Sequence, residues 1–145
     1  LCFAFYLELV EELDPCPLCI LQRACMAIGG SLALIAALHN PEKMGFRGYA
    51  ICQALFFSIG GLLAGRQIYL QSLPPDLVPS CGPDLDYLLE IFPFFEVLRM
   101  IILEDGTCAE VLWEFLGFSI PQWTIFAFFI LTVMCFIQIS NKLKN

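Results

Sequence analysis

Residues 14–30 of the chain read DPCPLCILQRACMAIGG. Two cysteines, Cys16 and Cys19, stand two residues apart, and the apolar run that follows them contains a single charge, Arg23. Pro17 suits the first turn of a helix, where its missing N–H would have no partner anyway. A helix that begins here places both sulfurs near its positive N-terminal end, which favours the thiolate form. The stretch therefore predicts a reactive thiol pair at the mouth of a membrane helix.

The rest of the chain has the composition of a membrane protein. Of its 145 residues, 59% are hydrophobic and 14% are charged, whereas a soluble domain is nearer half apolar and a quarter charged. Three apolar runs reach the roughly 20 residues that cross a hydrocarbon core, and a fourth, at residues 1–10, is too short. We interpret the short run as the end of a first transmembrane helix that begins upstream. A signal peptide is the alternative, but its basic start and small-residue cleavage site are missing.

The sequence thus predicts an all-α membrane protein, a four-transmembrane-helix bundle whose first helix is only partly present. Its expected segments are the end of the first helix (1–13), the thiol pair and second helix (14–38), a short loop (39–48), the third helix (49–73), a long loop (74–120) and the fourth helix (121–141). Within the long loop, a strongly apolar stretch interrupted by charges predicts short amphipathic helices on the membrane surface. Gly61 and Gly65 stand at small-xxx-small spacing in the third helix, which allows close helix contact. A chance pair of glycines is an equally good explanation.

Cationic residues predict the orientation of the bundle. Lysine and arginine mark the cytoplasmic side of a membrane protein. They occur in the short loop, at Lys43 and Arg47, and after the fourth helix, at Lys142 and Lys144. We therefore expect the short loop and both chain ends in the cytoplasm, and the thiol pair and the acidic long loop on the outer side. The sequence has no basic patch of the kind that binds nucleic acid.

The eight cysteines divide by location. Four lie in predicted membrane helices, where free cysteine packs as a small hydrophobe: Cys2, Cys25, Cys52 and Cys135. The other four fall on the outer side, where an oxidising compartment permits disulfides: Cys16, Cys19, Cys81 and Cys108. Four cysteines allow three connectivities, and the close pair makes Cys16–Cys19 with Cys81–Cys108 the first to consider. A zinc site of four thiolates stays open, although His39, at the far end of the second helix, cannot join it.

Two arginines inside the apolar runs are candidate site residues. Arg23 follows Cys19 by four residues and so lies on the same helix face, where a cation stabilises a thiolate or an anionic group bound beside it. An ionisable residue within a span is by default a functional-site hypothesis, although an arginine can also extend to the headgroups. Arg66, together with Gln67, would complete a polar pocket beside Arg23, and the headgroup alternative is about equally favoured for Arg66.

Three motifs together resemble the disulfide bond formation protein B (DsbB) family of bacterial inner-membrane thiol oxidases. They are PCPLCILQR at the head of the second helix, SCGPD in the long loop, and GTCAEVLWEFLGFSIPQW leading into the fourth helix. The resemblance extends from about residue 14 to the C-terminus. It implies a four-helix bundle with a long periplasmic loop, ubiquinone or menaquinone as cofactor, and a soluble periplasmic partner of the thioredoxin-like DsbA type.

The resemblance also implies a role for each matched residue. Cys81 would form the mixed disulfide with the partner, and Cys108 would be its bonded mate. Cys16 and Cys19 would pass the electrons on, with Cys19 nearest the quinone and Arg23 contacting it. Arg66 and Gln67 fall where the third helix borders the quinone in the family, although this local match is loose.

Other classes of protein remain alternatives. A vitamin K epoxide reductase-like enzyme shares quinone chemistry and a helix bundle, but its redox pair is expected at a later helix. A membrane scaffold would use the outer disulfides only to staple a loop, and a metal-binding membrane protein would use the same thiols as ligands.

Overall fold

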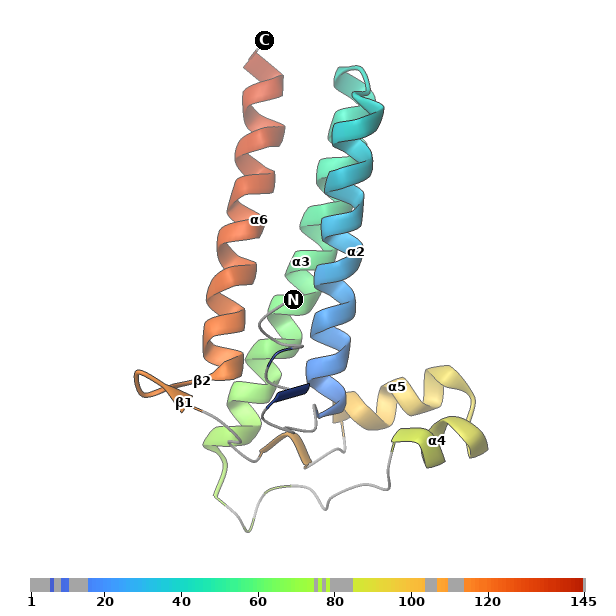
Figure 1. Ribbon diagram of the computed structural model, residues 1–145, viewed down its shortest axis with the longest axis vertical. Helices are drawn as coiled ribbons and strands as arrows, with labels where there is room; N and C mark the ends of the chain where they lie inside the picture. Colours follow the sequence, from blue (N-terminus) through green and yellow to red (C-terminus); the bar gives the residue numbers. More distant parts are fainter. Residues whose placement is uncertain are drawn as a thin grey trace.

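The computed structural model describes residues 6, 9–10, 16–74, 76, 78, 85–103, 107–109 and 114–144. Three long helices stand side by side: α2 (Pro17–His39), α3 (Lys43–Ser72) and α6 (Ile120–Lys144) (Figure 1). Between α3 and α6 come two short helices, α4 (Leu85–Ile91) and α5 (Phe94–Leu103), the 3-10 turn η2 (Thr107–Ala109), and a hairpin of β1 (Glu114–Phe115) and β2 (Phe118–Ser119). The start of α2, the short helices and the hairpin lie at one end of the long helices, and the α2–α3 turn lies at the other.

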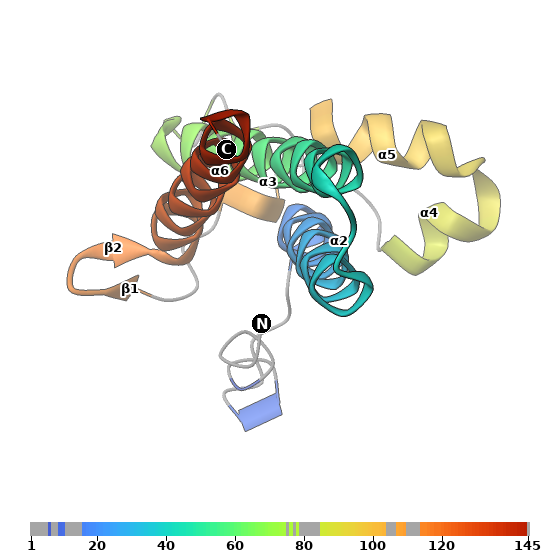
Figure 2. The same ribbon diagram turned by 90° about the horizontal axis from the view of Figure 1, so that it is seen from above.

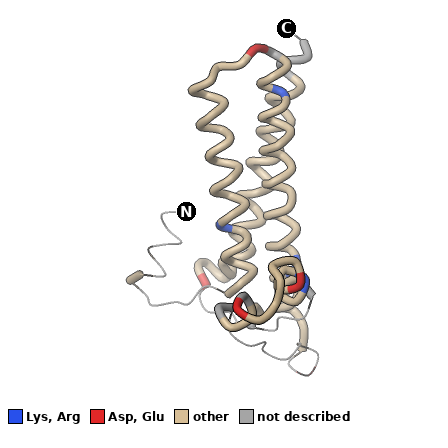
Figure 3. Tube along the Cα trace, turned by 90° about the vertical axis from the view of Figure 1, so that its right-hand side faces the viewer, with Lys and Arg blue, Asp and Glu red and all other residues tan. Residues whose placement is uncertain are grey.

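The long helices have the properties of membrane spans. The segments Pro17–His39, Met44–Ser72 and Ile120–Ser140 are each long and apolar enough to cross a membrane. Large apolar side chains face outward along them: Leu34 is 62% exposed, Leu62 75% and Phe129 65%. Such a surface suits lipid rather than water. Figure 3 shows the acidic residues at the ends of the bundle, most of them at the end with the short helices. The prediction of an all-α membrane protein is confirmed. The partial first helix at 1–13 lies outside the described residues except for positions 6, 9 and 10.

Helix α3 is the central helix of the described bundle. It contacts both α2 and α6 and lies between them when the molecule is viewed from above (Figure 2). Its buried positions recur every three or four residues, as expected for a helix that packs with one continuous face: Ala50, Gln53, Ala54, Phe57, Gly60, Ala64, Gln67 and Leu70. Because α2 and α3 are joined by a tight turn, they run antiparallel, and the start of α2 meets the end of α3.

Two glycines allow these helices to approach closely, and neither is part of the predicted Gly61/Gly65 pair. A Cβ atom at Gly29 would lie 2.7 Å from Cζ of Phe57, and one at Gly60 would lie 2.6 Å from Cε1 of Phe128. Phe57 and Phe128 belong to one buried cluster, with their ring centroids 6.3 Å apart. A Cβ at Gly61 or Gly65 would make only ordinary contacts, at 3.6 and 3.7 Å.

The turn between α2 and α3 is shorter than the sequence predicted. Helix α3 begins at Lys43, six residues before the expected start at 49, so that only Asn40, Pro41 and Glu42 connect the two helices. Asn40 ends α2 in the left-handed conformation, with φ of 42°, and its N–H donates to the carbonyl of Ala36 at 3.0 Å. Asparagine tolerates this conformation better than most residues, and a proline directly afterwards prevents the helix from continuing.

The loop between α3 and α6 contains the predicted amphipathic helices and also a hairpin that was not predicted. Pro93 separates α4 from α5, and its carbonyl accepts from the N–H groups of Glu96 and Val97 at 2.9 and 3.2 Å. In the hairpin, Leu116 and Gly117 both have positive φ, 56° and 78°, which is the geometry of the tight turns that suit twisted strands.

An aromatic cluster fastens the hairpin to α6. The indole N–H of Trp123 donates to the carbonyl of Phe115 at 3.3 Å. The ring of Trp123 also lies 5.9 Å from that of Phe118. Trp123 is 42% exposed in the first turn of α6, and indoles concentrate at such membrane–water interfaces.

The contact at Gly60 predicts a strong dependence of stability on one methyl group. We expect Gly60→Ala to lower the free energy of unfolding by about 1–3 kcal/mol, because the new Cβ forces the buried Phe128 ring out of its place. Gly61→Ala is the matched control, and we expect it to be neutral or stabilising by up to about 1 kcal/mol from helix propensity. Unfolding of the purified protein in mixed detergent micelles measures both values. Equal effects of the two substitutions would contradict this account of the packing.

Candidate redox site at the start of α2

The predicted thiol pair lies where the sequence placed it, at the first turn of α2. Cys16 is the N-cap, with extended backbone angles, and Pro17 occupies the first turn. Cys19 follows within the helix, and the thiol of Cys16 donates to the Cys19 sulfur at 3.3 Å. Both side chains are partly buried, and all six cysteines that the structure describes are free thiols. The geometry is that of a reduced dithiol whose sulfurs are already in contact.

Cys108 is brought to the same place from the far side of the long loop. It lies in η2, which packs against α3. Its side chain is 1% exposed, within a core cluster that includes Leu18 of α2 and Leu70 of α3. The Cys108 side chain is hydrogen-bonded to that of Cys16. Cys16 therefore stands between two other sulfurs, one on its own helix and one on the loop.

These contacts favour the protonated form of Cys16. Its side-chain hydrogen bond with Cys108 raises the pKa of the Cys16 thiol most, and the hydrogen bond with Cys19 and burial raise it further. The physical cause is that the thiol proton is held between sulfur atoms in a setting with little water to solvate a thiolate.

Two buried glutamines surround the thiol pair. Gln67 of α3 donates through Nε2 to the sulfurs of Cys19, at 3.3 Å, and Cys16, at 3.4 Å. Its Oε1 accepts from Nε2 of Gln22 at 2.8 Å and lies 3.5 Å from the Cys19 sulfur. Gln22 and Gln67 are each 4% exposed. The antiparallel pairing of α2 and α3 explains this arrangement, since the first turns of α2 face the last turns of α3.

The two predicted arginines have different surroundings. Arg23 is partly buried one turn beyond Cys19, and its positive charge acts on the Cys19 sulfur. Arg66 donates through Nε to the backbone carbonyl of Ile102 in α5. That bond ties the end of α3 to the short helices of the loop. Among the three predicted cofactor-binding residues, Gln67 and Arg23 thus lie at the thiol pair, whereas the identified bond of Arg66 leads to α5.

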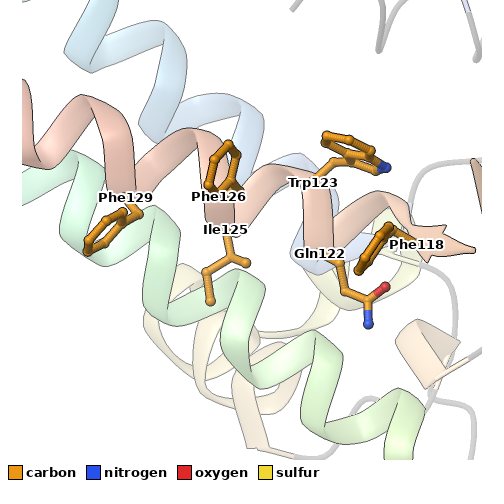
Figure 4. A pocket seen from close by; sticks show the side chains of 6 residues that line it. All are labelled: Phe118, Gln122, Trp123, Ile125, Phe126 and Phe129. Atoms are coloured by element: carbon orange, nitrogen blue, oxygen red, sulfur yellow. The ribbon is translucent and has the colours of Figure 1, made fainter. Parts of the chain in front are cut away.

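An apolar pocket of about 540 Å³ lies on α6 beside the hairpin (Figure 4). It is lined by Phe118, Gln122, Trp123, Ile125, Phe126 and Phe129. None of the predicted site residues lines it, and it is separate from the thiol cluster.

The remaining cysteines fall in three groups. Cys25 and Cys135 are buried in the middle of the bundle, as expected of small hydrophobic side chains, whereas Cys52 is exposed on α3. Cys81 and Cys2 lie outside the described residues. Among the His, Cys, Asp and Glu residues that the structure describes, no group of three or more could hold a metal ion. His39 lies at the opposite end of α2, with Nδ1 3.3 Å from the hydroxyl of Tyr49.

Sequence reasoning missed Gln22. It is the one uncharged polar residue between Cys19 and Arg23, and it follows Cys19 by three residues, so that both lie on the same helix face. A buried amide in a membrane helix needs a partner, and this requirement was the available signal. The partner itself, Gln67, could be found only by pairing α2 with α3.

Comparison with known proteins agrees with the geometry. The family model described as "Disulfide bond formation protein DsbB" matches residues 1–138. A "Disulfide bond formation protein B" of Hahella chejuensis is 54% identical over 126 residues, which is 87% of this chain and 76% of the relative. The corresponding protein of Nitrosococcus oceani is 49% identical over 97% of this chain and 83% of the relative. That of Stutzerimonas stutzeri is 45% identical over 96% and 85%. On this match over nearly its whole length, the chain belongs to the DsbB family.

Proposed function

We propose that this protein is a membrane oxidoreductase that generates disulfide bonds by passing electrons from a periplasmic dithiol protein of the DsbA type to ubiquinone or menaquinone. The proposal places the start of α2 and the long loop on the periplasmic side of the bacterial inner membrane. The observation that carries it is the row of three sulfurs, in which Cys16 is hydrogen-bonded to both Cys19 and Cys108. Such a row provides a route for stepwise thiol–disulfide exchange.

The first exchange takes electrons from the partner. A thiolate of the reduced partner attacks Cys81 of a Cys81–Cys108 disulfide, forms a mixed disulfide, and releases Cys108. The second thiolate of the partner then displaces Cys81. The partner loses two electrons and two protons as its own disulfide forms, and Cys81 and Cys108 become thiols. Exchange always proceeds through such a mixed disulfide.

The second exchange moves the electrons along the row. The Cys108 thiolate attacks Cys16 of a Cys16–Cys19 disulfide, forms a Cys16–Cys108 bond, and releases Cys19. Cys81 then attacks Cys108, restores the loop disulfide, and releases Cys16. The hydrogen bond between Cys108 and Cys16 supports attack at this sulfur rather than at Cys19. Cys19 is the leaving group, and the N–H···S hydrogen bond from Gln67 stabilises its developing negative charge.

The surroundings of Cys19 fit a membrane-soluble acceptor. The residue lies in a predicted membrane span, next to the 39% exposed Ile20 and one turn from Arg23. A quinone bound beside Cys19 would supply a two-electron, two-proton acceptor. Within the chain, Cys16 and Cys19 give up two electrons and two protons as their disulfide re-forms. Arg23 holds a positive charge where negative charge develops, and such stabilisation is commonly the largest catalytic contribution.

Removing single cysteines tests the route. We expect Cys19→Ser to abolish quinone reduction by the reduced partner, because no disulfide can form at the start of α2. We expect Cys81→Ser to prevent the mixed disulfide with the partner, which non-reducing gel electrophoresis detects. Cys52→Ser, an exposed cysteine on α3, is the control and should retain wild-type rates. Full quinone-coupled oxidation by Cys19→Ser would refute the scheme.

Arg23 provides a separate test of the quinone site. We expect Arg23→Ala to raise the KM for quinone by about tenfold or more, because charge-assisted hydrogen bonds are the stronger kind. Arg99→Ala, on the exposed side of α5, should leave KM unchanged. Steady-state quinone reduction at varied quinone concentration measures both. If Arg23→Ala has a wild-type KM, the arginine contacts headgroups and not the acceptor.

The contact between Cys16 and Cys108 predicts an unusual pH dependence. Because this contact raises the pKa of Cys16 above the ordinary value of 9.0, Cys16 of the reduced protein should stay protonated and react slowly with iodoacetamide at pH 9. The same residue in denatured protein should react at the rate of an ordinary thiol, since only the thiolate is nucleophilic. Mass spectrometry of the alkylated peptide gives both rates.

Removing Cys108 checks the cause of that pH dependence. Cys108→Ala deletes the largest contribution to the shift, so it should speed alkylation of Cys16 at pH 9, whereas Cys135→Ala, at a buried site elsewhere, should not. An unchanged rate in Cys108→Ala would show that the two sulfurs are not in contact.

A further inference from the structure

Two amides are buried between α2 and α3 at the point where an apolar contact would be expected. Gln22 and Gln67 are each 4% exposed, and both lie in segments suited to span a membrane. Burying an amide without hydrogen bonds is costly. The bonds in this case are made between the two amides and to the two sulfurs of the thiol pair. The amides are therefore part of the redox site and not only of the helix packing.

The hydrogen bond between the amides fixes which end of Gln67 faces the sulfurs. Nε2 of Gln22 donates to Oε1 of Gln67 at 2.8 Å. Turning the Gln67 amide over would place its NH₂ group against the NH₂ group of Gln22, donor against donor. With Oε1 held in this way, both hydrogens of Nε2 remain for the sulfurs of Cys19 and Cys16, at 3.3 and 3.4 Å.

We propose that Gln67 adjusts the redox equilibrium of the Cys16–Cys19 pair by donating to both sulfurs, and that Gln22 is the positioning residue that fixes the Gln67 amide. This inference rests on the proposed function, because it assumes that Cys16 and Cys19 cycle between dithiol and disulfide. It assigns Gln67 to the thiols, where the family resemblance suggested the quinone.

The direction of the effect follows from the chemistry of sulfur. An N–H donor stabilises an electron-rich sulfur, and a thiolate accepts a much stronger bond than a disulfide does. When Cys19 is protonated, its S–H has an acceptor in Oε1 of Gln67 at 3.5 Å. When the proton leaves, the Nε2 donor is already in place at 3.3 Å. Gln67 therefore serves both protonation states of the reduced pair and favours reduction of the disulfide.

A glutathione equilibrium measures this directly. Reduction of the Cys16–Cys19 disulfide converts two glutathione molecules into one glutathione disulfide and leaves two thiols on the protein. The experiment uses full-length protein in detergent micelles with Cys81 and Cys108 replaced by serine, so that the loop pair cannot exchange with Cys16 and Cys19. Differential alkylation and mass spectrometry give the reduced fraction at each glutathione ratio.

We expect Gln67→Met, which has similar length and no donor, to lower the equilibrium constant for reduction by about tenfold or more, as for loss of a hydrogen bond to a charged group. Gln67→Glu keeps the shape but replaces the donors by a carboxylate, so its decrease should be at least as large. Gln22→Met acts only through Gln67, and about a threefold decrease is expected. These decreases should appear whether or not the variants lose stability, which unfolding in detergent measures separately.

Gln53 provides the matched control. It is also a buried glutamine of α3, 7% exposed, and its Oε1 lies 3.8 Å from a thiol, that of Cys135. Gln53→Met should leave the equilibrium within about twofold of wild type, since its hydrogen bond is to a different cysteine. A wild-type equilibrium in Gln67→Met would overturn the inference, and so would an equal shift in Gln53→Met.

The assay contains neither quinone nor partner protein, so its outcome is independent of the electron acceptor. A shift in Gln67→Met together with no quinone reduction by the wild-type protein would refute the proposed acceptor and support the role of Gln67. Normal quinone reduction without the shift would refute the role of Gln67 alone.

Discussion

The close contact of α3 with its two neighbours sets the geometry on which the redox site depends. At Gly29 and Gly60 there is no room for a methyl group beside the rings of Phe57 and Phe128. The contact at Gly29 limits how far α3 can shift along α2, and this register brings Gln67 level with Cys16 and Cys19. A different shift by one turn would move the amide by about 5.4 Å, which is beyond hydrogen-bonding reach of either sulfur. Packing in the middle of the membrane thus determines the chemistry at its edge.

The sequence alone was sufficient for the class of fold and for the thiol pair. Apolar runs of membrane length, each with at most one charge, identify α2, α3 and α6. A helix that crosses lipid must satisfy its backbone internally and cover it with apolar side chains. Pro17 at the first turn predicted where α2 begins. The start of α3 was harder to predict, since the charged residues before the apolar run are compatible with a helix end outside the hydrocarbon. Hydropathy identifies the part of a helix that lies in the hydrocarbon core, but not the polar turns by which the helix extends beyond the core.

The contacts across helices could not be predicted in the same way. The sequence pointed to Gly61 and Gly65, whereas the tight contacts are at Gly29 and Gly60, because which glycine faces a ring depends on the rotation of each helix. Gln22 was missed for the same reason: its role depends on Gln67, 45 positions away. The hairpin before α6 was missed because Leu116 takes a backbone conformation that leucine rarely adopts. The motifs that carry the family resemblance identify the cysteines, but they do not predict contacts between helices or the conformation of the hairpin.

The placement of Cys16 at the N-cap gives the two cysteines of the thiol pair different backbone conformations. Cys19 sits within a helical turn, so its side chain is restricted to the few rotamers that clear the preceding backbone. Cys16 has extended backbone angles, and its carbonyl is anchored by the N–H of Ile20 at 3.2 Å. Because the Cys16 sulfur contacts both Cys19 and Cys108, Cys16 can exchange one disulfide partner for the other while its backbone stays in place. Electrons can therefore pass from the loop cysteines to Cys16 and Cys19 without any unwinding of α2.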